Sequence, residues 1–168
     1  MTISMYQASA PRFANTLNNL SKILDKAQAY ADAKKVDPTV LTGFRLYPDM
    51  LPLTRQIQIA TDGAKGAMAR LAGVDIPKFE DTEKTIAELK ERIAKTVAFI
   101  ETIKPQQVDG TEDKAIVLPG ASGERHLKGM QYLLGWAYPN FYFHVTTTYN
   151  ILRHCGVEVG KMDFLGTP

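Results

Sequence analysis

The sequence is poor in the side chains that most often carry chemistry, with one cysteine and three histidines among its 168 residues. The single cysteine, Cys155, cannot close an internal disulfide, which is typical of proteins from a reducing compartment. The first residues also lack the basic region and the apolar run of a secretion signal. We therefore expect a cytoplasmic protein.

Charge of one sign and long apolar runs are also scarce. Lysine and arginine together number 20 and aspartate and glutamate 18, so the formal net charge is only +2. This balance argues against a nucleic-acid partner, which a basic surface would attract. No apolar run approaches the roughly 20 residues of a membrane-spanning helix, so we expect no membrane partner either. The length and the apolar fraction of 45% fit one soluble domain, residues 1–168.

Helical periodicity, by contrast, is abundant. Apolar residues recur three and four positions apart, which is the spacing of one helical face, in four separate stretches. Four amphipathic helices of this length predict an all-α four-helix bundle. The stretches cover residues 13–31, 50–71, 86–103 and 140–155.

The residues at the ends of these stretches predict where the helices begin and end. Pro11 fits the first turn of the first helix, where its missing N–H leaves no bond unmade. Gly73 fits the cap after the second helix. Either Asp81 or Thr82 fits the cap before the third helix, and Pro139 fits the first turn of the fourth.

Two features inside the helices call for interpretation. Gly63 and Gly66 lie within the second helix, where close packing against another helix is the first interpretation and room for a ligand is the second. In the third helix, Glu88 and Arg92 are spaced for an ion pair on the side opposite to the apolar stripe. We therefore expect this charged face to be solvated rather than to form a site.

The chain between the third and fourth helices is too long for an ordinary bundle loop and must carry structure of its own. Lys114–Leu118 and Met130–Trp136 are short apolar runs on either side of a turn-rich segment. They predict either the two strands of a β-hairpin or a loop followed by a helical turn. The expected fold is thus a four-helix bundle with a short β-hairpin or structured loop between helices 3 and 4.

His144 is the strongest candidate for a functional residue, because it lies on the apolar stripe of the fourth helix with Ile151 and Cys155. Three interpretations stand: a packed histidine bonded at both nitrogens, a catalytic base, or a metal ligand. A metal site needs three or more convergent ligands. At about 100° per residue, His154 lies about 80° off the face of His144 and does not point at the same ion.

Spacing and residue type suggest which groups surround this histidine. Asn140 precedes His144 by one helical turn. Gln56 and Gln58 are polar residues of the second helix, where a glutamine can bond to an interior histidine or to a ligand. Trp136 belongs to an aromatic cluster before the fourth helix, and part of that cluster is a candidate dimer surface. We expect a ligand pocket formed by His144, Asn140, Gln56, Gln58 and Trp136.

The other reactive side chains are weaker candidates. His126 lies in the turn-rich segment, either exposed to solvent or folded over the end of the bundle toward His144. Cys155 lies near a helix C-terminus, where the helix dipole disfavours a thiolate. We expect Cys155 to be a buried and unreactive thiol.

The stretch from His144 to Gly156 resembles the last helix of the DinB/YfiT-like superfamily of metalloenzymes, in which a histidine begins a helix that ends in a Leu-Arg…Gly signature. A closer resemblance, over essentially the whole chain, is to an uncharacterised family within it, domain of unknown function 1993. The segments that carry it are "RLYPDMLPLTRQIQIATD", "RLAG", "PNFYFHVTTTYNILRH" and "VGKMDFLG".

The resemblance implies an up-down-down-up bundle that is often dimeric. It also implies a zinc or nickel site made of three histidines, one from the second helix and two from the last. In this chain His144 takes the place of the final ligand, while Asn140 stands four residues earlier and Gln56 or Gln58 takes the place in the second helix. We therefore expect a degenerate metal site and no metal cofactor.

Three functions are compatible with these features. The first is a small-ligand-binding or structural homodimer that uses no metal. The alternative is a thiol-dependent, metal-assisted transferase, as in some superfamily members, with His144 as base or as ligand to zinc or nickel. The third is a partner-binding module that uses the aromatic end of the fourth helix. These interpretations leave open whether the chain is an enzyme.

Overall fold

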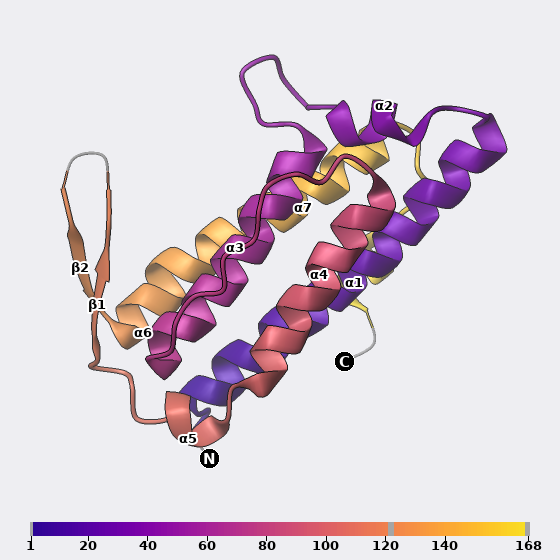
Figure 1. The fold of residues 1–168 in the computed structure, drawn as a ribbon. Helices are drawn as coiled ribbons and strands as arrows, with labels where there is room; N and C mark the ends of the chain where they lie inside the picture. Colours follow the sequence, from indigo (N-terminus) through magenta and orange to yellow (C-terminus); the bar gives the residue numbers. More distant parts are fainter. Residues whose placement is uncertain (1, 121–122, 167–168) are drawn as a thin grey trace.

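The computed structural model describes residues 2–120 and 123–166 and is built on four long helices: α1 (Met5–Lys34), α3 (Leu53–Ala72), α4 (Ile86–Thr102) and α7 (Tyr138–His154). Helices α1 and α7 run in one direction, and α3 and α4 run in the other (Figure 1). Helix α3 packs against both α4 and α7, and α1 packs against α4. The expected four-helix bundle is confirmed. Of the predicted domain 1–168, residues 1, 121, 122, 167 and 168 lie outside this description.

Shorter elements join and cover these helices. Strands β1 and β2 pair in antiparallel fashion, so that Ala115 lies opposite Lys128 and Leu118 opposite Arg125. The hairpin expected between the third and fourth long helices is therefore confirmed. The shorter elements are α2 (Pro38–Gly43), α5 (Pro105–Val108), β1 (Ala115–Leu118), β2 (Arg125–Lys128), α6 (Gly129–Tyr132), the π-helical turn η1 (Leu133–Ala137) and α8 (Lys161–Leu165).

The second strand of the hairpin is not the expected one. All of Met130–Trp136 is helical, within α6 and η1, and β2 is the polar segment that precedes it. Tyr132, Leu133 and Ala137 are buried at helical spacing, so this apolar run faces the core as part of a helix. Its burial explains why the run continues into α7 instead of pairing with β1.

Helix α1 begins before Pro11 and not at it. Ser4 Oγ accepts a hydrogen bond from the Gln7 N–H at 3.3 Å, and the Gln7 side chain accepts one from the Ser4 N–H at 3.5 Å. This capping box satisfies the first turn. Pro11 therefore lies inside the helix on its exposed side, where water can bond to the Gln7 carbonyl that the proline leaves unpaired.

Helix α4 is capped by Thr85 and not by Asp81 or Thr82. Thr85 Oγ1 accepts from the Glu88 N–H at 3.2 Å, and the Glu88 carboxylate accepts from the Thr85 N–H at 2.9 Å. Glu88 is thus used at the start of the helix. The expected pair between Glu88 and Arg92 is wrong, because Arg92 is bonded elsewhere, as described below.

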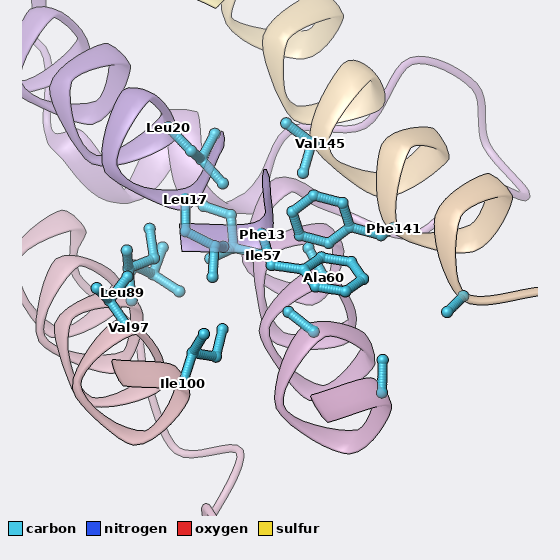
Figure 2. Packing of buried hydrophobic residues seen from close by; sticks show 14 of the residues in the cluster. Phe13, Leu17, Leu20, Ile57, Ala60, Leu89, Val97, Ile100, Phe141 and Val145 are labelled. Atoms are coloured by element: carbon cyan, nitrogen blue, oxygen red, sulfur yellow. The ribbon is translucent and has the colours of Figure 1, made fainter. Parts of the chain in front are cut away.

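The apolar faces of the long helices meet in one core (Figure 2). Leu17 of α1, Ile57 of α3 and Leu89 of α4 are fully shielded from solvent. Phe13 meets Phe141 of α7 edge to face, with ring centroids 4.9 Å apart, which is a geometry that aromatic pairs prefer. Burial of each such side chain contributes roughly 1.5–3 kcal/mol, so the apolar stripes hold the bundle together. No helix in the two described ranges has the length and the apolar character to span a membrane.

Because α3 and α4 run in the same direction, the chain between them has to return along the bundle. Residues 73–85 make this return, and Figure 1 shows them passing back along α3 to the start of α4. Gly73 ends α3 as expected and adopts the left-handed conformation, with φ of 73°. Residues 73–85 are referred to below as the crossover.

The two glycines of α3 do not serve close helix packing, contrary to the first interpretation. A Cβ atom on Gly63 would meet nothing within 4 Å, and one on Gly66 would meet only the guanidinium of Arg70. Gly63 therefore faces open space. Gly66 leaves room for a side chain of its own helix.

Candidate functional site

His144 and Gln56 meet between α7 and α3. His144 Nδ1 lies 2.7 Å from Gln56 Oε1, and Gln56 Nε2 donates to the Leu51 carbonyl at 3.0 Å. The Gln56 residue is only 2% exposed, so both ends of its amide are held by protein groups. The structure therefore brings together two of the predicted site residues, one from each helix.

These bonds determine which nitrogen of His144 carries the proton. Because Gln56 gives its N–H to Leu51, its oxygen faces Nδ1 and requires an N–H there. Burial lowers the pKa of His144, which keeps the imidazole neutral. Among the described residues Nε2 has no bonded partner and no buried side-chain nitrogen or oxygen lacks one, so Nε2 reaches the surface. His144 thus presents one lone pair to solvent.

Asn140 and Trp136 bond to each other and not to His144. Asn140 Nδ2 donates to the Trp136 carbonyl at 2.7 Å, within the π-helical turn η1. Pro139 follows this turn. A proline has no N–H to donate to a carbonyl of the preceding turn, and its ring clashes with that carbonyl in a regular α-helix. The wider turn accommodates the proline. The Asn140 amide adds a side-chain hydrogen bond to the Trp136 carbonyl at the end of this turn. The Arg125 guanidinium stacks on the Trp136 ring, 4.3 Å from its centroid.

Gln58 lies on a different side of α3 from Gln56, as two positions in a helix require. Its oxygen accepts from Arg55 Nη1 at 2.7 Å, and its nitrogen donates to Glu83 Oε2 at 2.8 Å. Gln58 is therefore not a neighbour of His144. It bonds instead to Glu83, which belongs to a cluster of charged groups that sequence reasoning missed.

Arg92 of α4 is at the centre of that cluster, and its side chain is only 1% exposed. Its Nε donates to Thr61 Oγ1 at 2.8 Å. Nη2 pairs with Asp62 at 2.7 Å and with Asp81 at 3.0 Å, while Nη1 pairs with Glu83 at 3.0 Å. The expectation of a solvated face is wrong for this residue. These five residues are referred to below as the arginine cluster.

The groups of the cluster hold one another in their charged forms. Burial alone would lower the pKa of Arg92, but the surrounding carboxylates outweigh it and raise that pKa. The hydrogen bond from Arg55 is the main cause that lowers the pKa of Asp81. Burial raises the pKa of Glu83, but its hydrogen bonds from Gln58 and Arg92 outweigh this and lower it. Arg92, Asp81 and Glu83 are therefore all charged at neutral pH.

The cluster ties the crossover to α3 and α4. Asp81 and Glu83 belong to the crossover, and Arg92 Nη1 also donates to the carbonyl of Glu80 at 3.1 Å. A signal for this network does exist in the sequence. It is a polar stripe on α3 with residues three and four positions apart: Gln58, Thr61 (or Asp62) and Lys65.

The remaining histidines and the cysteine make other contacts. His126 lies exposed in β2, with its Nε2 3.5 Å from the Glu124 carboxylate. The His154 ring lies against Phe44, with centroids 5.5 Å apart. Cys155 is only partly buried and not fully buried as expected. This partial burial raises the pKa of its thiol, which supports the expectation of an unreactive thiol.

Comparison with known proteins shows to which family the chain belongs. The family model described as Domain of unknown function (DUF1993) matches residues 5–165. The chain belongs to the DUF1993 family. Its fold is similar to the crystal structure of a DinB family member protein from Shewanella denitrificans, with a TM-score of 0.92 and 44% sequence identity over 97% of this chain and 92% of that one. No curated protein matches the chain.

The residues of this DUF1993 chain do not fit the three-histidine metal site that its resemblance to the superfamily implies. The amide nitrogens of Asn140 and Gln56 are bonded to backbone carbonyls, and Gln56 Oε1 is bonded to His144. In the described ranges, no three His, Cys, Asp or Glu side chains form a group that could hold a metal. One imidazole nitrogen remains, and a single such donor binds a transition metal weakly.

Proposed function

We propose that this DUF1993-family protein binds a small organic molecule at His144, as a homodimer and without a transition metal. The observation that supports this is the pair of bonds made by Gln56, to His144 Nδ1 and to the Leu51 carbonyl. They leave Nε2 as a neutral hydrogen-bond acceptor at the surface. A ligand with a hydroxyl or N–H group suits such an acceptor.

The surroundings of His144 favour an uncharged and partly apolar ligand. Phe143 is 56% exposed, and its ring stands edge-on to the imidazole with centroids 5.2 Å apart. Leu51, whose carbonyl holds Gln56, is 42% exposed. Binding sites for small organic molecules typically combine apolar lining with a few well-placed polar groups.

The same apolar side chains support a homodimer. Large exposed apolar groups are enriched at interfaces between subunits. A second copy that covers Phe143 would also cover the neighbouring His144, and would enclose a ligand that one chain leaves open to water. Gel filtration with light scattering is expected to give a dimer mass at micromolar concentration. Phe143→Ser should shift the protein to monomer, whereas Val117→Ser, on the exposed hairpin, should not; a wild-type monomer contradicts this part of the proposal.

A pair of matched probes tests the ligand chemistry. Phenol carries a hydroxyl donor, and anisole has the same ring with the donor replaced by a methyl ether. We expect phenol at concentrations of about 1–20 mM to shift the Nε2 resonance of His144 in a saturable way, and anisole to have no such effect. The effect should disappear in His144→Phe. Equal responses to the two probes, or none, contradict the proposed role of His144.

Elemental analysis of the purified protein tests the metal-free part of the proposal. We expect far less than one zinc or nickel per chain, and a His144→Gln variant that stays folded. Stoichiometric zinc or nickel that is lost in His144→Ala would contradict the proposal. It would favour the alternative of a thiol-dependent, metal-assisted transferase.

A further inference from the structure

A hollow separate from His144 lies between α3 and the crossover. It has a volume of ≈ 640 Å³, and three of its lining residues are cations from α3 and the crossover. The crossover also contributes an apolar wall. The cations are Lys65, Arg70 and Lys78, and the wall consists of Ile76, Pro77 and Phe79.

Lys65 is held firmly at this hollow. Its side chain is only 5% exposed, and Nζ pairs with Asp62 Oδ1 at 2.6 Å. Nζ also lies 3.9 Å from the centroid of the Phe79 ring, an arrangement in which the ring face attracts the cation. The same Asp62 oxygen accepts from Arg92 Nη2 at 2.7 Å, so one carboxylate serves two cations. Of the charged residues that line the hollow, Lys65, Arg70 and Lys78 are cations, whereas Asp62 and Glu80 are anions, so positive charge is in excess there.

Arg70 lies at the same hollow, beside Gly66 and Tyr132. Its Nη1 donates to the Tyr132 hydroxyl at 3.2 Å. A Cβ atom on Gly66 would come within 2.6 Å of that nitrogen, so the guanidinium lies where only a glycine leaves space. One edge of the guanidinium is thus held in place. A cation held in this way loses little conformational freedom when it binds an oxyanion.

We propose that this hollow binds a small molecule in which a phosphate or carboxylate group is joined to an apolar ring. The oxyanion is held among the three cations, and the ring packs against Phe79 and Ile76 of the crossover. Glu80 also lines the hollow, and its charge weakens the attraction for the anion. A bound molecule bridges α3 and the crossover.

Titration of the ¹⁵N-labelled full chain with phenyl phosphate tests the proposal. We expect saturable shifts in the amide resonances of residues 62–70 and 76–80, with a Kd of about 1 mM or lower. A parallel titration with benzoate shows whether a carboxylate serves in place of a phosphate. Glu80→Gln should tighten binding of either probe. Absence of saturable shifts at these amides with both probes overturns the proposal, and inorganic phosphate that binds as tightly as phenyl phosphate overturns the role of the ring.

Two glycines of α3 provide a matched pair of variants. Gly66→Ala and Gly63→Ala each add one methyl group and the same gain in helix propensity, but only the first displaces Arg70 Nη1. We expect Gly66→Ala to weaken binding of phenyl phosphate about tenfold, and Gly63→Ala to leave it unchanged. Arg70→Gln should weaken binding at least as much, with Lys22→Gln on the exposed side of α1 as its control. Equal affinity in the two glycine variants overturns the proposal, and thermal denaturation confirms that each variant is folded.

Discussion

Replacement of Arg92 by methionine tests how the crossover is held. The substitution keeps a long, unbranched side chain but removes the N–H groups that the carboxylates of Asp81 and Glu83 accept from α4. Removal of one partner of a buried ion pair costs about 3–5 kcal/mol. The side chain of Glu83 is 13% exposed and that of Asp81 is 37% exposed, so water can solvate both in part. The expected loss therefore lies at the lower end, about 3 kcal/mol.

Urea denaturation followed by circular dichroism measures this loss as a change in the free energy of unfolding. In a thermal scan, about 3 kcal/mol corresponds to a fall in Tm of roughly 6–12 °C for a chain of this length. Lys22→Met on α1 is the control and should change stability by less than about 0.5 kcal/mol. Amide hydrogen exchange gives a second readout. The crossover amides should exchange faster in the Arg92 variant, whereas the exchange rates of the α1 amides should change less.

A combined variant separates the loss of ion pairs from the loss of packing. Glu83→Gln, added to Arg92→Met, removes the carboxylate that the first substitution leaves without a cation, whereas Asp62 keeps Lys65 and Asp81 keeps Arg55. If uncompensated charge causes the loss, this addition should restore about half of it or more. The reasoning is refuted by an initial loss below about 1 kcal/mol, or by a loss that the added substitution leaves unchanged.

Three further outcomes follow from the same structure. The pKa values of Asp81 and Glu83 in the folded protein lie below their ordinary values of 3.8 and 4.5. The contribution of these carboxylates to stability is therefore present above about pH 4.5 and is lost as the pH falls through the folded values. Urea denaturation at a series of acidic pH values checks this loss. Gln56→Glu places a carboxylate beside Nδ1 and should raise the pKa of His144 above its ordinary 6.5, and an NMR titration without such a rise contradicts the bond. Thr85→Ala should cost about 1 kcal/mol of stability in urea denaturation, because it removes the cap of α4.

The long helices could be predicted from the sequence because their apolar period is a local property. Their exact ends could not, because good capping residues compete for other partners. Asp81 and Thr82 are suitable caps by type, yet Asp81 is bonded to Arg55 and Arg92. That leaves Thr85, closer to the first apolar residue of α4, to cap the helix.

The candidate site also has parts that could be predicted from local sequence patterns and parts that could not. A bond between a glutamine of the second helix and His144 could be anticipated, because both residues interrupt apolar stripes that face each other. The bond from Asn140 to the Trp136 carbonyl could not be anticipated, because it depends on a π-helical turn that Pro139 favours. The burial of Arg92 could not be predicted from the period of α4, since the groups that cover it come from α3 and the crossover.

The arginine cluster is a consequence of the order of the helices. Because α3 and α4 are parallel, the crossover has to return along roughly 26–30 Å of helix, and residues 73–85 reach about 43 Å when fully extended. A segment this extended cannot satisfy its own backbone groups, which need partners from the bundle. Arg92 supplies one such partner, through its bond to the Glu80 carbonyl, and it also holds the crossover through ion pairs to the side chains of Asp81 and Glu83. The buried charge is thus explained by topology, and the hollow lined by Lys65 exists because the same arginine holds the crossover against α3.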